Sequence, residues 1–371
     1  MCVDYSSDGR VVFTLDAGGT NYVFAAMVGG RKVGRCVRLD PEPSDLQKSI
    51  SNIKGGFNML LKETGLRPCA ISFAFPGPAD YENGVIYNIG NIPAFSGGVP
   101  LAGILEHEFG VPVFINNDGD LFTYGEAVAG ALPRINNIMQ SNGNPKRYKN
   151  LFGITLGTGL GGGFVVDGKL YTGDNSNAAE IWLMTDRRNL DGFAEEQACA
   201  RAVQKNYAML ANISDYRKYS PKDIEDIALG KLEGDAAAAK EAYRLMGESL
   251  GDVLCEISRI VDCPIVIGGG VSYGYPLFME PLVDFMNSKL KNADGKEFPR
   301  LVQKVYNLED ARQAGDFALG GVKDIQIPGT DKKIVSVCQK RIGVCISKLG
   351  ASNAVSIGAY TLALSRLDGA K

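Results

Sequence analysis

Apolar residues near the start of the chain form short β-rich runs that are followed by one helical repeat. Runs at 11–15, 22–28 and 32–39 are separated by glycines, which predicts a β-meander. Behind a start signal at Pro43-Ser44, apolar residues recur every three to four positions until Gly65. This spacing predicts an amphipathic helix that covers the sheet.

The alternation of strand and helix patterns continues along the next 60 residues. Apolar runs at 70–75 and 113–115 predict two strands, with a helical stretch at 101–109 between them and another at 121–132. This order predicts a mixed α/β sheet.

The opening pattern recurs from Leu151. Strands are expected at 151–156, 164–166 and 169–171, with a glycine loop after the first and an Asp167-Gly168 hairpin turn before the third. The segment from Thr14 to Thr20 and the segment from Thr155 to Gly161 have the same place in the two copies. The sequence therefore predicts an internal duplication.

The remaining pattern is mostly helical. Helices are expected within 194–260, one of them with Ser220 as N-cap, Pro221 in the first turn and Gly230 at its end. A strand at 264–267 precedes three glycines. The segment 307–328 has weak periodicity and is interpreted as an irregular insertion.

Size and charge narrow the function. A chain of 371 residues exceeds the usual single domain, which favours two lobes with a cleft between them. The net charge of −3, without a basic cluster, disfavours nucleic acid or an anionic membrane as partner. No apolar run is long enough to span a bilayer and the first ten residues are polar, so a cytoplasmic protein is expected.

The eight cysteines form no C-x-x-C pair and are expected to be reduced and mostly buried. The single histidine, His107, lies on the predicted helix at 101–109 and is expected to be structural or at the surface.

Two glycine hairpins, at 16–21 and 156–163, are the first candidate site. Glycine lets backbone N–H groups approach an anion closely, and Thr20 and Thr158 add hydroxyl donors. Either run alone is better explained as a tight turn. Their repetition in matching positions favours phosphate binding.

Asp16 stands at the end of an apolar strand, where an unpaired charge is costly. A Mg²⁺ ion, held through water, would supply a partner beside phosphate groups. The alternative is that Asp16 caps a turn.

Asn117 and Asp118 follow the strand at 113–115 and precede a helix, so both side chains are expected at the carboxyl end of a strand. There, Asp118 could accept the proton of an attacking alcohol. The alternative interpretation of Asn-Asp-Gly is a helix-capping turn.

Glu180 and Glu195 lie in a segment rich in small and apolar residues, and carboxylates accept the hydroxyl hydrogens of sugars well. Surface glutamates are an equally good interpretation. The glycines at 268–270 follow a buried strand and suggest a nucleotide-binding turn.

Together these motifs resemble the ROK family of sugar kinases and related repressors. The resemblance covers nearly the whole chain and rests on segments in this order: DAGGTN at 16–21, FPGP at 75–78, NIP at 91–93, ND at 117–118, LGTGLGGG at 156–163, AEI at 179–181 and IGGGV at 267–271.

The resemblance implies an α/β, two-lobed actin-like ATPase (ribonuclease H-like) fold with duplicated βββαβα cores and an interlobe cleft. The expected small lobe is 1–117 with the C-terminal helix at about 353–371, and the large lobe is 118–352. Closure of the lobes on the sugar would expel water.

The same resemblance implies the roles of individual residues. Asp118 would be the catalytic base and Asp16 would bind Mg²⁺. The residues expected to bind sugar are Asn117, Glu180, Glu195, Asn91 and Gly77, and those expected to bind ATP are Gly18, Gly19, Thr20, Asn21, Thr158, Gly159, Gly161, Gly269 and Gly270.

The chain departs from the family pattern at three places. Trp182-Leu183 stands where many members have Gly-His, so an imidazole that touches the sugar is missing. The cysteines that bind structural zinc in many members are absent between Met184 and Glu195, which predicts no zinc. The first glycine loop begins at Asp16, with no room ahead of it for a DNA-binding helix-turn-helix, which disfavours a repressor.

The expected activity is ATP- and Mg²⁺-dependent phosphorylation of a hexose or N-acetyl-hexosamine at the 6-hydroxyl, by a homodimer. A non-catalytic sugar sensor with the same fold is the main alternative. An acyl kinase would need a cationic residue near Asp118, and the neighbouring sequence has none.

Overall fold

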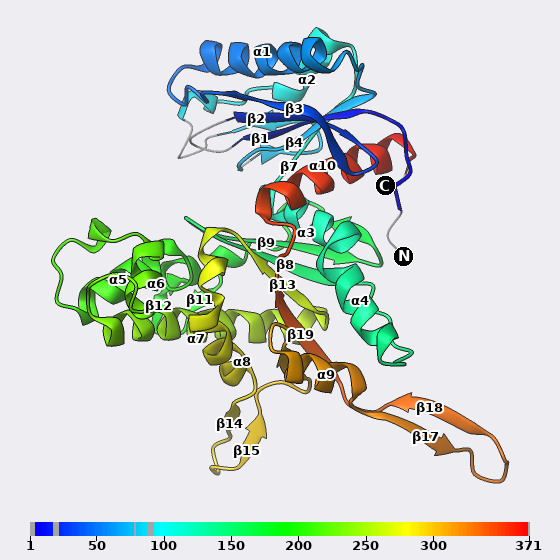
Figure 1. Ribbon diagram of the computed structural model, residues 1–371, viewed down its shortest axis with the longest axis vertical. Helices are drawn as coiled ribbons and strands as arrows, with labels where there is room; N and C mark the ends of the chain where they lie inside the picture. Colours follow the sequence, from blue (N-terminus) through cyan, green and yellow to red (C-terminus); the bar gives the residue numbers. More distant parts are fainter. Residues whose placement is uncertain (1–3, 18–21, 78, 88–92, 370–371) are drawn as a thin grey trace. The chain divides into compact units, whose positions relative to one another are not determined.

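The computed structural model describes residues 4–17, 22–77, 79–87 and 93–369. They form two compact units, shown in Figure 1. The first contains residues up to Gly130, together with Gly163–Ala178 and the segment from Leu349 onward. The second contains Ala131–Gly162 and Ala179–Lys348. The predicted lobe boundaries, after 117 and after 352, stay a prediction.

The first unit is built on a five-stranded sheet with the order β3-β2-β1-β4-β7. An antiparallel meander forms one side of the sheet, and β4 and β7 continue it parallel to β1. The predicted meander is therefore confirmed. The strands are β1 Val12–Ala17, β2 Tyr22–Val28, β3 Arg31–Leu39, β4 Ala70–Ala74 and β7 Val113–Asn116.

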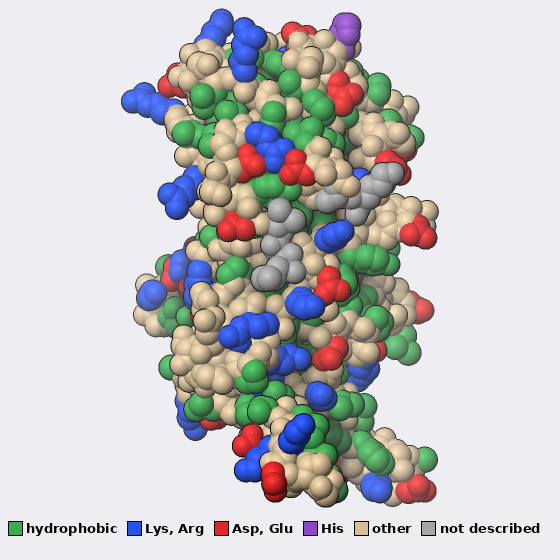
Figure 2. Space-filling model, turned by 90° about the vertical axis from the view of Figure 1, so that its right-hand side faces the viewer, with side chains coloured by type: hydrophobic (Ala, Val, Ile, Leu, Met, Phe, Trp, Pro, Cys, Tyr) green, Lys and Arg blue, Asp and Glu red, His purple; other side chains and the backbone are tan. Residues whose placement is uncertain are grey.

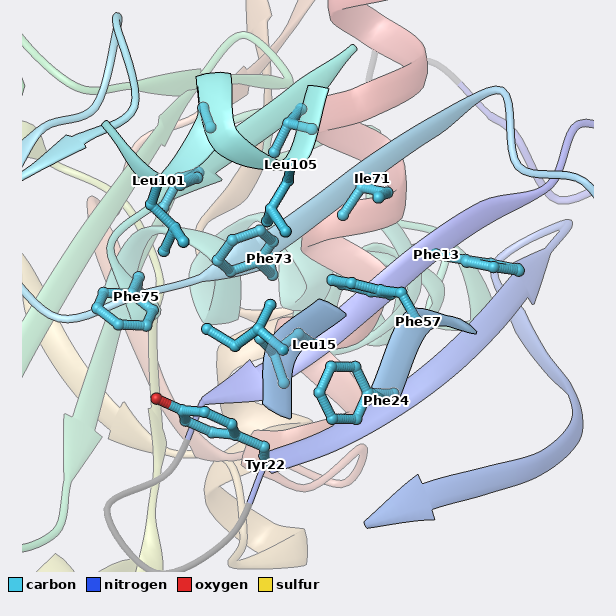
Figure 3. Packing of buried hydrophobic residues seen from close by; sticks show 14 of the residues in the cluster. Phe13, Leu15, Tyr22, Phe24, Phe57, Ile71, Phe73, Phe75, Leu101 and Leu105 are labelled. Carbon is cyan, nitrogen blue, oxygen red and sulfur yellow. The ribbon is translucent and has the colours of Figure 1, made fainter. Parts of the chain in front are cut away.

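Alternate side chains of this sheet point to opposite faces, so each face has its own apolar layer. On one face, Phe13, Phe73 and Phe24 pack with Phe57 of α1 (Leu46–Thr64) and with residues of α2 (Leu101–Phe109), as Figure 3 shows. On the other face, Val12, Met27 and Ala70 pack against Tyr360 and Leu364 of α10 (Ala351–Leu367).

One of the two predicted boundary signals of α1 is confirmed and the other is not. Gly65 ends the helix with a left-handed φ of 65°, as predicted. The start differs from the Pro43-Ser44 prediction, because Asp45 is the N-cap and its side chain accepts the Lys48 N–H at 3.0 Å.

The predicted helix at 121–132 is wrong in its extent. It begins earlier, because Asn117 caps α3 (Asp118–Ala129), and it ends at Gly130, where a second helix, α4 (Ala131–Ser141), starts. Gly125 and Gly358 let α3 and α10 pack at backbone contact, since a Cβ at these positions would lie 2.0 Å from the Ala354 oxygen and 1.9 Å from the Leu121 oxygen.

The second sheet repeats the plan of the first, with the order β10-β9-β8-β13-β19-β16. A meander again stands at one edge and β13, β19 and β16 follow parallel to β8, which confirms the duplicated pattern. The predicted strand at 164–166 starts earlier, at Leu160. The strands are β8 Leu151–Leu156, β9 Leu160–Val166, β10 Lys169–Tyr171, β13 Ile265–Gly268, β16 Lys304–Asn307 and β19 Arg341–Ile346.

The helices of the second unit follow the sequence pattern between 194 and 260. Ser220 caps α6 and forms a capping box with Asp223, with Pro221 in the first turn, as predicted. These helices are α5 Ala200–Leu210, α6 Pro221–Ala228 and α7 Ala236–Val261, and a further helix, α8 Tyr275–Met286, follows β13.

The segment 307–328 is regular, so its prediction as an irregular insertion is wrong. It contains α9 (Ala311–Leu319), which Asp310 caps, and β17 (Val322–Gln326), which pairs with β18 (Lys333–Val337). In α9 only Phe317 and Ala318 are buried and Gly315 interrupts the pattern, which explains the weak periodicity.

Short elements complete the described chain. They are β5 Ala79–Asp80, β6 Val85–Ile86, β11 Thr185–Asp186, β12 Asn189–Phe193, β14 Lys289–Lys291, β15 Glu297–Pro299, and the 3-10 turns η1 Pro93–Phe95, η2 Ile181–Leu183, η3 Ala194–Glu196, η4 Tyr216–Lys218 and η5 Gly270–Gly274.

Candidate functional site

Two acidic residues stand at the carboxyl edge of the first sheet. Asp16 in β1 is level with Ala74 in β4, which is level with Asn116 in β7. Two strand spacings separate Asp16 from Asn116, about 10 Å. Asp118 follows two residues later, as the sequence predicts for a strand end.

Asp118 is the first residue of α3, and its Oδ1 accepts the Gly119 N–H at 2.9 Å. The residue is exposed, although protein packed around its carboxyl group removes part of that group's hydration. This desolvation, with the like charge of Asp16 as a second cause, raises the pKa of Asp118 above its usual range. A carboxylate with a raised pKa is a stronger base.

Asn117 caps helix α3, which is the alternative interpretation of the Asn-Asp-Gly sequence. Its Oδ1 accepts the Gly119 N–H at 2.8 Å, which fixes the side chain at the start of α3. Because the oxygen is engaged, the Nδ2 group is what Asn117 can offer to a ligand.

Asp16 accepts a hydrogen bond from the Ser352 hydroxyl at the start of α10. Sequence reasoning missed Ser352, because nothing near residue 352 indicates which strand end its helix reaches. Among the described residues no three His, Cys, Asp or Glu side chains gather as a metal site. A single carboxylate fits Mg²⁺ that takes its other ligands from water and phosphates, and it does not fit a metal bound by protein alone.

The glycine loop after β8 is closed by hydrogen bonds of its own. The Gly157 N–H donates to the Gly159 oxygen at 3.0 Å, and the Leu160 N–H donates to Glu195 Oε2 at 3.0 Å. The N–H groups of Thr158 and Gly159 lack protein acceptors within the described chain, and Thr158 is exposed. The loop therefore has two backbone donors and one hydroxyl for an anion.

The glycines of this loop also make room for protein atoms. A Cβ at Gly159 would lie 2.6 Å from Glu195 Oε2, and one at Gly161 would lie 2.3 Å from the Thr155 hydroxyl. In the first unit, a Cβ at Gly163 would lie 2.4 Å from the Gly119 oxygen. Glycine is therefore required at these positions by close packing against protein atoms, in addition to the predicted close approach of a phosphate.

A second glycine segment lies beside this loop. Gly268 in β13 is level with Thr155 in β8, so both strands end at the same edge. Gly269 has a φ of 94°, and a Cβ there would lie 2.4 Å from the Leu156 oxygen. At Gly270 nothing in the described parts of the chain lies within 4 Å of a Cβ, so this residue borders space that those parts leave open.

Glu195 in η3 is partly buried and holds two partners. Besides the Leu160 N–H, it meets Arg201, whose Nη2 lies 3.3 Å from Oε1. Arg201 was missed in the sequence, since only the fold shows that α5 turns it back toward η3.

Glu180 is exposed and precedes η2. It accepts a hydrogen bond from Trp182 Nε1, and the Trp182 ring meets Phe193 edge-on at 5.8 Å. The residue that departs from the family pattern therefore orients a carboxylate predicted to bind sugar.

Several predicted residues remain without a structural account. Gly18, Gly19, Thr20, Asn21 and Asn91 lie outside the described residues. Gly77 is described, and a Cβ there would lie 3.1 Å from the Tyr81 hydroxyl.

The remaining observations concern the cysteines, the histidine, the surface charges and the length of apolar helices. The described cysteines are free, and Cys199, Cys255, Cys263 and Cys345 are buried. His107 is exposed in the last turn of α2. On the face shown in Figure 2, positive and negative side chains are interspersed. Within the described ranges, the search for a helix long and apolar enough to cross a bilayer finds none.

Comparisons with known proteins agree with this arrangement. The chain is 27% identical over 282 residues to N-acetyl-D-glucosamine kinase of Vibrio cholerae, covering 73% of this chain and 87% of the relative. It is 26% identical over 289 residues to glucokinase of Thermotoga maritima, covering 72% and 84%.

Solved structures give the same result. A crystal structure of glucokinase from Parabacteroides distasonis is 41% identical, with a TM-score of 0.88, and the match covers 98% of this chain and 99% of that one. A ROK family glucokinase from Streptomyces griseus, solved with glucose and AMPPNP, shares the fold at 19% identity, with a TM-score of 0.61 and coverage of 94% and 98%.

These relatives confirm two predictions, the actin-like ATPase fold and the enzyme class, an ATP-dependent carbohydrate kinase. The ROK family model matches residues 12–319. The chain is thus a member of the ROK family.

Proposed function

We propose that this ATP-dependent sugar kinase transfers the γ-phosphoryl group of ATP to the 6-hydroxyl of a hexose or an N-acetyl-hexosamine. The similarity to kinases named for glucose and for N-acetyl-D-glucosamine supports this substrate class. The observation that carries the proposal is the placement of Asp118, a strand-end carboxylate with a raised pKa beside a second acid.

Asp118 acts as the general base in this mechanism. Its carboxylate accepts the proton of the sugar hydroxyl while that oxygen forms a bond to the γ-phosphorus, and the bond from the γ-phosphorus to the β,γ-bridging oxygen breaks to release ADP. The Asn117 cap and the Gly119 N–H hold Asp118 in place, so little reorientation is needed for proton transfer.

The phosphate groups bind to backbone donors. The Thr158 and Gly159 N–H groups and the Thr158 hydroxyl, which the protein leaves unused within the described residues, neutralise the phosphate oxygens. Gly269 and Gly270 border the adenosine. Gly18, Gly19, Thr20 and Asn21 act in the same way in the first glycine loop.

Asp16 holds Mg²⁺ through water, with the Ser352 hydroxyl fixing its carboxylate. When bound, the ion supplies neutralisation of the charge that develops on the phosphate oxygens.

The sugar is held by carboxylates and amides. Glu195 and Glu180 accept hydrogen bonds from sugar hydroxyls, and Asn117 donates through Nδ2. Asn91 and Gly77 are further proposed contacts. Because the Trp182 indole engages Glu180, the sugar preference of this chain is proposed to depend on that pair. No zinc, a homodimer and a cytoplasmic location also stay predictions.

The test is ADP release with glucose, fructose, mannose, N-acetylglucosamine and N-acetylmannosamine, on wild type and Asp118→Asn. We expect turnover with one hexose or hexosamine, a product phosphorylated at the 6-position by NMR, and a loss of about 10²- to 10⁴-fold in the variant. Sugar affinity of Asp118→Asn measured by calorimetry should stay within a few fold.

An absence of turnover on every sugar, with normal ATP and sugar binding, would favour the non-catalytic sensor. The xylose repressor of Caldicellulosiruptor bescii, which is 24% identical over 238 residues, makes this alternative worth excluding.

A further inference from the structure

The second unit contains a cavity of about 280 Å³ that is separate from the residues proposed to bind sugar, ATP or magnesium. Its walls come from β11, η3, α7 and Phe285 of α8; β11, α7 and α8 are labelled in Figure 1. Small-molecule sites occupy roughly 300–1,000 Å³. The cavity therefore has room for a ligand no larger than a monosaccharide.

Charged groups in the cavity wall and Arg300 next to it form pairs that are too long for direct hydrogen bonds. Asp252 Oδ1 lies 3.8 Å from Arg187 and also 3.8 Å from Arg300, and Arg188 lies 3.9 Å from Glu248. Charge-assisted hydrogen bonds between such groups are usually about 2.7–2.9 Å long. Arg188 already donates to the Leu245 oxygen at 2.9 Å, and Glu248 already accepts from Arg244. The two long distances at Asp252 therefore carry the argument, because they leave space for a bridging polar atom.

Phe285 keeps two of these guanidinium groups in position. Arg300 lies 4.4 Å and Arg187 5.2 Å from the centre of its ring, within cation–π range. The spacing of Asp252 between the two arginines is thus built into the wall and does not depend on a ligand.

The wall also contains a buried polar atom that lacks a partner. Ser249 Oγ on α7 is shielded from solvent and makes no hydrogen bond within the described parts of the chain. Buried polar side-chain atoms in native proteins are nearly always hydrogen-bonded. Ser249 Oγ would bond to a ligand in the cavity once its side chain turns toward that ligand.

The signs of the charges select the chemistry of that ligand. Two arginines (Arg187 and Arg188) and three acids (Asp186, Glu248 and Asp252) line the cavity. Arg300, which is outside the lining, approaches Asp252 at 3.8 Å and balances the third acid, so an ionic ligand would add an unbalanced charge. A carboxylate only accepts and an ammonium only donates hydrogen bonds, whereas a hydroxyl does both and can bridge an arginine and an aspartate. We propose that this cavity is a second binding site for a neutral, polyhydroxylated molecule, namely a monosaccharide.

The cavity lies next to the turn η3, which contains Glu195. Ala194 and Gln197 line it and flank Glu195 in and after η3. The Ala194 N–H donates to the Met184 oxygen at 2.7 Å, which ties η3 to the residue before β11. A bound sugar would hold this hairpin and Glu195 in one arrangement, so occupancy raises the affinity of the candidate site. This regulatory step rests on the proposed function; the binding site itself does not.

The experiment is isothermal titration calorimetry without ATP, using D-glucose, N-acetyl-D-glucosamine and glucose 6-phosphate. Ser249→Val and Asp252→Asn alter the cavity, Glu195→Gln alters the candidate site, and Arg312→Ala, on the exposed side of α9, is the control. Melting temperatures verify that each variant folds.

We expect two sugar sites per chain in wild type and the control. Each cavity variant should weaken one site by tenfold or more and keep the other, and Glu195→Gln should do the reverse. The dependence of rate on sugar should be sigmoidal in wild type and hyperbolic in both cavity variants.

A single site in wild type, or two sites unchanged in both cavity variants, would overturn the proposal and leave a cavity that holds only water. Binding of glucose 6-phosphate without binding of either neutral sugar would overturn the ligand class. Two-site binding in an enzyme that phosphorylates no sugar would reject the proposed function and retain the cavity site.

Discussion

Glu195 accepts a hydrogen bond from the Leu160 N–H at 3.0 Å, and a Cβ on the neighbouring Gly159 would lie 2.6 Å from the same carboxylate oxygen. The residue proposed to bind sugar is therefore also the support of the loop proposed to bind phosphate. Arg201, which lies 3.3 Å from the other oxygen, completes this arrangement. The sites proposed for the two substrates are therefore linked through one side chain.

Replacing Glu195 with alanine should consequently raise the KM of ATP as well as that of the sugar. A hydrogen bond to a charged group contributes about 1.5–3 kcal/mol, which predicts roughly a 10- to 100-fold loss in kcat/KM. Steady-state kinetics with each substrate varied in turn measures both effects. Glu196→Ala is the matched control, because among the described residues Glu196 pairs with the part-exposed Arg201 and the exposed Lys205 and not with the glycine loop. A change confined to the sugar KM would disprove the role in loop support.

The raised pKa of Asp118 predicts the pH dependence of the reaction. The base is active when deprotonated, so kcat/KM should fall as the pH drops through the pKa of Asp118, at a pH above that of an ordinary aspartate. Asp16→Asn removes the like charge and should move this acid limb to lower pH while reducing the rate. Asp80→Asn, at a part-exposed acid whose pKa is lowered by hydrogen bonds from Asn83, should leave the limb in place.

The raised pKa of Asp118 also predicts that its ionised carboxylate destabilises the folded protein. Desolvation makes the folded protein bind the Asp118 proton more tightly than the unfolded chain does, so stability is lost as the pH rises from the unfolded pKa through the folded pKa. Asp118→Asn removes this cost and should have a melting temperature at pH 7 above that of wild type. The difference should shrink as the pH is lowered to about 4, near the unfolded pKa. A lower melting temperature than wild type at pH 7 would contradict the assignment.

The sequence was most informative where the signal was local. The strand end before Asp118, the left-handed stop at Gly65 and the cap at Ser220 each depend on neighbouring residues alone, and all three are observed. The repeated meander was visible because both copies keep the same order of strands, glycines and turns.

What the sequence could not show depends on distant residues. Gly159 faces Glu195, Gly163 faces Gly119, and Ser352 reaches Asp16 from a segment 336 positions away. Such glycines look the same whether a phosphate or a protein atom approaches them. The cavity beside η3 depends on residues of α7 and α8 and leaves no motif.

The contact between α3 and α10 predicts a strong effect far from any ligand. Gly125→Ala or Gly358→Ala would place a Cβ within 2.0 Å of a backbone oxygen of the facing helix, and backbone cannot swing aside as a side chain can. Overpacking of this kind costs about 1–3 kcal/mol, and the shift of α3 should displace Asp118 and lower kcat. Gly103→Ala in α2 has open space and should stabilise by about 0.5–1 kcal/mol. Chemical denaturation and kcat on the three variants test this prediction.

Two neighbouring glycines separate the folding role of the turn after β13 from its proposed role in binding ATP. Gly269→Ala is strained at φ 94° and would meet the Leu156 oxygen at 2.4 Å, so it should lower the free energy of unfolding by about 1–3 kcal/mol. At Gly270 no atom of the described residues lies within 4 Å of a Cβ, so Gly270→Ala should keep its melting temperature. If adenosine lies against Gly270, the same methyl group should raise the KM of ATP several fold and leave the KM of the sugar unchanged. An unchanged KM of ATP in Gly270→Ala would remove this glycine from the ATP site while leaving the structural role of Gly269 intact.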